Sequence, residues 1–79
     1  MSSLIDICDS VAKSKGILHK AAIQTLRDYI KAAPEEELTR VIISMNKSEH
    51  LRALWEAGLS IGLQHAVVNR LEVLSREQH

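Results

Sequence analysis

The stretch LWEAGLSIGLQHAVVNRL, residues 54–71, decides how the fold is interpreted. An apolar segment is followed by a short turn around Gly58 and then by a second apolar segment, the order found in the helix-turn-helix of DNA-binding proteins. The same order also describes two packed helices of a small bundle, one ended by a glycine and the next capped by Ser60.

The helix-turn-helix interpretation fails at two positions. Its two helices cross closely, which requires a small residue four positions before the turn glycine and an apolar residue early in the second helix. This chain has Leu54 at the first position and Gln64 at the second. The second segment also begins with few of the side chains that read base edges. We therefore interpret both segments as bundle helices and keep a degenerate helix-turn-helix around Gly58 as part of the alternative.

Apolar residues recur every three to four positions along the whole chain, which is the period of an amphipathic helix. Strand signals are nearly absent, because there is no alternating run bounded by turn residues. Five helices are expected, over about residues 3–15, 17–32, 34–47, 49–57 and 61–76.

Capping residues mark the expected ends of these helices. A side-chain oxygen is expected at the N-terminal cap of three helices, supplied by Ser2 or Ser3 (with Asp6 three residues after Ser3), Ser48 and Ser60. Proline is favoured at a first helical position, which we assign to Pro34, followed by acidic residues in the first turn. Glycine is favoured where a helix ends, which we assign to Gly16 and Gly58.

The apolar stripe of each expected helix supplies one shared core. Its expected members are Leu4, Ile7, Cys8 and Val11; Leu18, Ala22, Leu26, Tyr29 and Ala33; Leu38, Val41, Ile42 and Met45; Leu51, Leu54 and Trp55; and Leu63, Ala66, Val67, Leu71 and Leu74. The prediction is a single all-α domain over residues 1–79. It is a compact bundle of five short helices, in one version two helical hairpins bridged by the central helix after Pro34.

Composition narrows the function classes. The chain has 79 residues, no net charge and a single cysteine, Cys8, so neither an internal disulfide nor a cysteine zinc cluster is expected. The four histidines lie at no ligand spacing, and no Ser or Cys has a base at motif spacing, so we expect no metal, no cofactor and no enzyme activity. No apolar run reaches the ~18 residues of a membrane span, so we expect a cytoplasmic protein without a membrane partner.

Surplus apolar positions point to a protein partner. Trp55 shares a helix face with Leu51 and Leu54, which predicts a core position, but a partly exposed tryptophan would anchor a partner. Ile43, Val68 and Val73 lie off the main stripes. Arg70 falls on an apolar stripe, where it must pair with a carboxylate such as Glu37 or Glu56, or meet a partner.

The resulting hypothesis is a small interaction module, adaptor or regulator that docks through an apolar helical patch. A homodimer is favoured over a monomer. The expected partner-binding residues are Trp55, Val68, Arg70 and Val73.

The alternative hypothesis is nucleic-acid binding by the second helix. Polar residues at spacings of four, three and four form one stripe there, which would contact phosphates. Its members are Lys20, Gln24, Arg27 and Lys31. A solvated helix face explains the same stripe, and no aromatic residues interleave with it to stack on bases.

Overall fold

The computed structural model describes residues 3–77, which form five helices and no strand. The helices are α1 (Leu4–Lys13), α2 (Ile17–Ala32), α3 (Glu35–Ser44), α4 (Ser48–Ala57) and α5 (Ile61–Glu77). The predicted all-α bundle of five short helices is confirmed.

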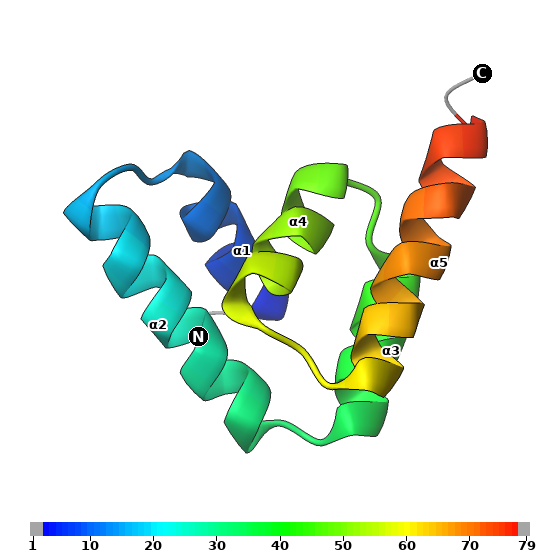
Figure 1. The fold of residues 1–79 in the computed structure, drawn as a ribbon, viewed down its shortest axis with the longest axis horizontal. Coiled ribbons are helices and arrows are strands. Elements are labelled where there is room, and N and C mark those ends of the chain that lie inside the picture. The colour runs from blue at the N-terminus through cyan, green and yellow to red at the C-terminus, as the bar shows by residue number, and fades with distance from the viewer. Residues whose placement is uncertain (1–2, 78–79) are drawn as a thin grey trace.

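The fourth helix is the centre of the arrangement. It packs against α1, α2 and α5, whereas the main partner of α3 is α5. Figure 1 shows α2 and α5 as the two arms of a V, with α4 between them. The helix after Pro34 is therefore not the central bridge that the sequence suggested, because α3 lies along α5 at one side.

The core combines one stripe from each helix. Its fully buried large side chains include Leu26, Ile42, Leu51, Leu54 and Val67. The predicted stripes of α1, α3 and α5 all lie in this core, with Val41, Ala66 and Leu71 only partly buried. Burial of these side chains is the main source of stability in so small a domain.

The stripe of α2 is rotated from its predicted position. Leu18, expected inside, is 72% exposed, and Ile23 is buried although it was not expected. Leu26 is buried as predicted, while Ala22, Tyr29 and Ala33 are partly buried. The reason is that only part of α2 is covered, since it packs mainly against α1 and α4.

Both positive-φ glycines lie at connections between helices. Gly58, with φ of 98°, is the C-terminal cap of α4, as predicted. Gly16, with φ of 65°, precedes α2, whereas α1 already ends at Lys13. Gly16 thus reverses the chain between two helices instead of ending the first one.

The structure confirms some of the predicted serine caps and not others. Ser3 and Asp6 form the predicted capping box of α1, and Ser2 lies outside the described residues. The Ser60 hydroxyl accepts the Leu63 N–H at 3.5 Å at the start of α5. The cap of α4 is Lys47, because Ser48 is already its first helical residue.

Pro34 is the N-terminal cap of α3 and Met45 is its C-terminal cap, so this helix is shorter at both ends than predicted. Glu35, Glu36 and Glu37 fill its first turn as expected. Across residues 3–77, no helix has both the length and the apolar character needed to cross a bilayer.

Candidate functional site

Trp55 lies on the outside of α4 and is half exposed, so its predicted core position is wrong. Its relative exposure is 50%, whereas Leu51 and Leu54 of the same helix are fully buried. A large aromatic side chain left half in water is the kind of group that anchors a partner.

Two adjoining cavities between α4 and α5 have Trp55 in their lining. The first has a volume of about 290 Å³ and is lined by Arg52, Trp55, Val68 and Leu71. The second, of about 220 Å³, is lined by Trp55, Gln64, His65, Val68 and Asn69. We call the two together the Trp55 groove. Its lining combines three apolar residues with one cation, one histidine and two side-chain amides.

The structure brings together two of the four predicted partner-binding residues. Trp55 and Val68 line both cavities. Val73 is also exposed, but it follows Val68 by five residues, which turns it roughly 140° around α5. Val73 therefore belongs to another side of the helix and does not line the groove.

Arg70 bonds the end of α3 instead of a carboxylate. Its Nε donates to the Met45 carbonyl oxygen at 2.7 Å, and a second guanidinium nitrogen donates to the Asn46 side-chain oxygen at 3.2 Å. The expected pairing with Glu37 or Glu56 is wrong. The C-terminal carbonyls of a helix carry partial negative charge, which explains why a half-buried guanidinium is stable there.

Arg52 is a groove residue that sequence reasoning missed. It lies three positions before Trp55, so both side chains share one face of α4. That spacing was visible in the sequence, but it had meaning only once Trp55 was known to be exposed.

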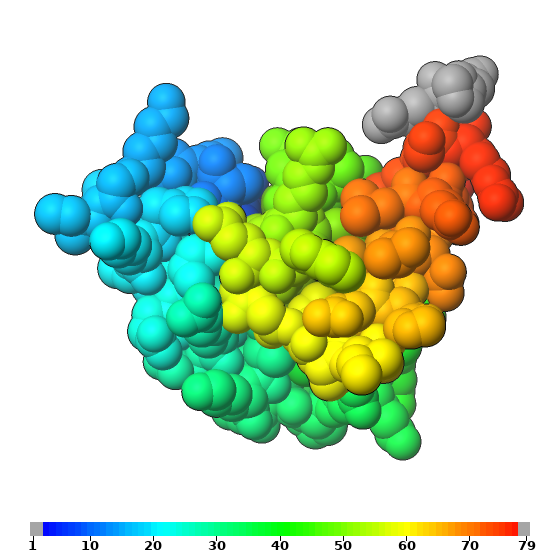
Figure 2. All heavy atoms as spheres, in the orientation of Figure 1, coloured from blue at the N-terminus to red at the C-terminus, as the bar shows by residue number. Residues whose placement is uncertain are grey.

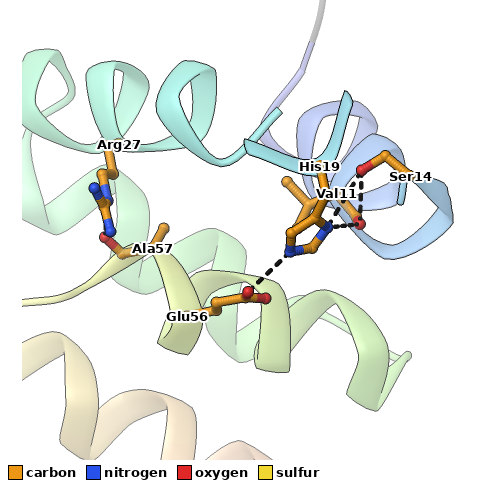
Figure 3. A network of polar contacts seen from close by, with 6 residues as sticks. All are labelled: Val11, Ser14, His19, Arg27, Glu56 and Ala57. Carbon is orange, nitrogen blue, oxygen red and sulfur yellow. Dashed lines mark hydrogen bonds and ion pairs between the residues drawn. The ribbon is translucent and has the colours of Figure 1, made fainter. Parts of the chain in front are cut away.

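A second polar cluster joins three helices around His19 (Figure 3). The His19 Nε2 lies 2.8 Å from Glu56 Oε1, and its Nδ1 lies 3.1 Å from the Val11 carbonyl oxygen. The Ser14 hydroxyl is 3.4 Å from the same Nδ1. No sequence pattern indicates this cluster, because Glu56 is 37 positions away from His19.

A serine, a histidine and a glutamate in contact resemble a nucleophilic triad, but the atoms that face the two ring nitrogens argue otherwise. A triad needs one histidine nitrogen free to accept the serine proton. Here both ring nitrogens face oxygen acceptors, and the hydrogen bond to Glu56 raises the pKa of His19. The ring is therefore suited to carry a positive charge between the helices, and Ser14 has no basic nitrogen to activate it.

A third polar cluster joins α1 to α4. The His50 Nε2, which is buried, lies 3.3 Å from Asp9 Oδ1, and Lys13 lies 2.8 Å from the other Asp9 oxygen. The hydrogen bonds from Lys13 and His50 lower the pKa of Asp9. Nearby, burial raises the pKa of the Cys8 thiol to about 12, so this cysteine stays protonated and is a poor nucleophile.

The polar stripe predicted to bind phosphate is exposed, but two of its four members have partners within the chain. The Arg27 Nε donates to the Ala57 carbonyl oxygen at 2.9 Å, and the Gln24 amide donates to Asp28 at 3.0 Å. Lys20 and Lys31 are exposed. Arg27 thus stabilises the C-terminal end of α4 in the way that Arg70 stabilises the end of α3.

In the part of the chain that the structure describes, no group of three or more His, Cys, Asp or Glu side chains is placed to hold a metal ion. Comparison with family models, with curated proteins and with solved structures finds no match for this chain.

Proposed function

We propose that this protein is a non-catalytic interaction module that pairs with a second copy of itself through the Trp55 groove. The observation that carries the proposal is the half-exposed Trp55 indole, which lines two adjoining cavities with Val68. An adaptor or regulatory role would follow from such pairing, because the bundle would present two identical surfaces in one particle.

The groove has the composition of an interface centre. Tryptophan and arginine are enriched among the residues that contribute most to binding, and they act from pockets near the middle of an interface. Trp55 and Arg52 line one cavity here. Ile61 extends the apolar surface, since it is exposed and lies seven residues before Val68, on nearly the same side of α5.

Charge at the rim favours a second copy as the partner. A two-fold interface must be complementary to itself. Arg52 lines the groove, and the exposed carboxylate of Glu72 lies one helical turn after Val68. Among the described residues, neither of them forms an ion pair within the chain. Each copy therefore offers the cation that the other copy's carboxylate needs, and the neutral chain does not repel itself.

The available surface permits a dimer of ordinary size. Stable interfaces bury roughly 800 Å² on each partner, which is about one seventh of the 5481 Å² surface of this chain. A cytoplasmic location is part of the proposal, because the single cysteine, Cys8, is a buried free thiol and such thiols suit a reducing compartment.

Sedimentation equilibrium over a range of protein concentrations tests the proposal. The mass should rise from the 8.8 kDa of one chain toward twice that value. Trp55→Ala should weaken association by about tenfold or more, the usual loss at an interface anchor. Val73→Ala, which changes an exposed side chain outside the groove, should have no effect.

A charge exchange identifies the partner as the same chain. Arg52→Glu alone should weaken the dimer, because it places like charges at the rim. Adding Glu72→Arg to it should restore association. A chain that stays monomeric at every concentration, or a dimer indifferent to Trp55→Ala, would refute the proposal.

A further inference from the structure

The most exposed large apolar side chains of α2 lie far from the Trp55 groove, at the connection between α1 and α2. Ile17 is 86% exposed and Leu18 is 72% exposed, and they follow each other directly after Gly16. Figure 1 shows this connection as the left-hand corner of the molecule, at one end of its longest dimension. In the space-filling view the same blue-to-cyan corner projects beyond the rest of the surface (Figure 2).

Positive charge is concentrated around this corner. From residue 10 to residue 27 the chain has four Lys and Arg residues and no Asp or Glu, although the whole chain is neutral. Lys15 and Lys20 flank the apolar pair on either side and are exposed. Two of the carboxylates close to this corner are engaged, since Asp9 pairs with Lys13 and Glu56 with His19. The exposed Glu49 also lies near Lys13, so the net positive charge of the tip comes mainly from Lys15 and Lys20. We call residues 13–20 the basic tip.

We propose that the basic tip is a membrane-surface contact, in which Ile17 and Leu18 enter the interface of an anionic lipid layer while Lys15 and Lys20 contact its headgroups. This inference is independent of self-association through the Trp55 groove. We expected no membrane partner because the sequence lacks a spanning segment, but a contact at the surface needs no span.

The shape of the tip favours lipid over a protein or a nucleic acid. The two apolar side chains project from a corner, and none of the cavities described above is lined by them. A lipid layer can deform around two projecting apolar side chains, whereas a folded protein partner would need a pocket that fits them. Nucleic acids would use the lysines, but they offer no apolar layer to receive Ile17 and Leu18.

General magnitudes suggest a weak and reversible contact. Each methylene moved into the acyl boundary strengthens binding about fourfold, and each lysine near an anionic surface strengthens it about fivefold. Two short side chains and two lysines therefore give measurable binding only where anionic lipid is abundant, and salt should weaken it.

Co-sedimentation with lipid vesicles tests the proposal. The full chain is mixed with vesicles of phosphatidylcholine alone or with added phosphatidylserine, and the partition coefficient is measured. Binding is expected only to the anionic vesicles. The double variant Ile17→Ser with Leu18→Ser should lose about tenfold or more in partitioning. Ile43→Ser, which changes an exposed isoleucine on α3, is the matched control and should bind like the unmodified chain.

Three results would overturn the proposal. The first is no binding to the anionic vesicles. The second is equal binding by the Ile17→Ser, Leu18→Ser variant, which would show that the apolar pair does not enter lipid. The third is binding of a DNA fragment, equally by the unmodified chain and by this variant, when neither binds vesicles. That result would show that the tip contacts phosphates and not lipid. Circular dichroism confirms that the variants keep their helices.

Discussion

His19 and Glu56 join two helices that are distant in the sequence, with the imidazole Nε2 of His19 lying 2.8 Å from the Glu56 carboxylate. The same ring reaches back to the Val11 carbonyl at the end of α1. One side chain therefore ties the start of α2 to both α1 and α4. Because a histidine makes these contacts, the stability of the bundle should depend on pH.

His19 should stabilise the fold more in mild acid than at alkaline pH. Its pKa is raised above the ordinary 6.5, first by the hydrogen bond to Glu56. A group whose pKa is higher in the folded state than in the unfolded state stabilises the fold fully at pH values below its unfolded-state pKa. This stabilisation is lost as the pH rises through its folded-state pKa. The free energy of unfolding, from urea titrations at several pH values, should therefore differ most between the wild type and His19→Gln below pH 6.5. Glu56→Gln should remove the same pH-dependent difference. A difference that grows toward alkaline pH would contradict this account.

Asp9 should act in the opposite direction. Its pKa is lowered below 3.8, first by the hydrogen bond from Lys13 and then by that from His50. A group whose pKa is lower in the folded state than in the unfolded state stabilises the fold at pH values above its unfolded-state pKa. This stabilisation is lost as the pH falls through its folded-state pKa. Asp9→Asn should therefore be less stable than the wild type near neutrality, and the difference should vanish in strong acid. Asp6→Asn, at the N-terminal cap of α1, is the control: it tests whether replacing another carboxylate of that helix gives the same dependence of stability on pH. Persistence of the Asp9→Asn difference in strong acid would show that the pair is not its cause.

Two leucines of α2 should differ greatly in their response to the same substitution. Leu26 is fully buried, so Leu26→Ala should lower the free energy of unfolding by about 2–5 kcal/mol. Leu18 is largely exposed, so Leu18→Ala should change it by less than about 0.5 kcal/mol. Chemical denaturation of both variants measures the contrast. Similar losses in the two would mean that Leu18 packs in the core, as the sequence pattern suggested.

These leucines also show what the sequence could and could not predict. The three-to-four spacing predicted every helix and most buried residues, because burial of one face is what that spacing encodes. It failed at Leu18 and Trp55, since periodicity shows which residues share a face but not how far a neighbouring helix covers that face. Coverage depends on tertiary packing, which here leaves the start of α2 and one side of α4 open.

The polar contacts were the least predictable part. The helical spacing places Arg70 on an apolar stripe but does not identify its partner, a main-chain carbonyl oxygen, because such a group has no sequence signature. Arg27 likewise donates to a main-chain carbonyl oxygen, that of Ala57, and no sequence pattern indicates this contact. The His19 cluster depends on residues of three helices meeting in space, and no local spacing encodes such a meeting.

Arg70 should be more important to stability than its half-buried position suggests. Arg70→Ala removes two donors from the end of α3 and should lower the free energy of unfolding by about 1.5–3 kcal/mol, the usual range for a charged hydrogen bond. Arg70→Lys should recover only part of this loss, because an ammonium lacks the planar fork. Arg76→Ala, at an exposed position of α5, is the matched control. Equal melting temperatures for Arg70→Ala and Arg76→Ala would contradict the assigned role.

The emission of Trp55 tests self-association most directly, because this is the only tryptophan of the chain and it lies in the proposed interface. Its indole is half exposed in the single chain, so pairing should transfer it from water to an apolar contact. The account predicts emission at shorter wavelength in concentrated protein and a shift to longer wavelength on dilution, in step with the fall in mass. Emission that stays constant while the mass changes, or a mass that never exceeds that of one chain, would contradict it.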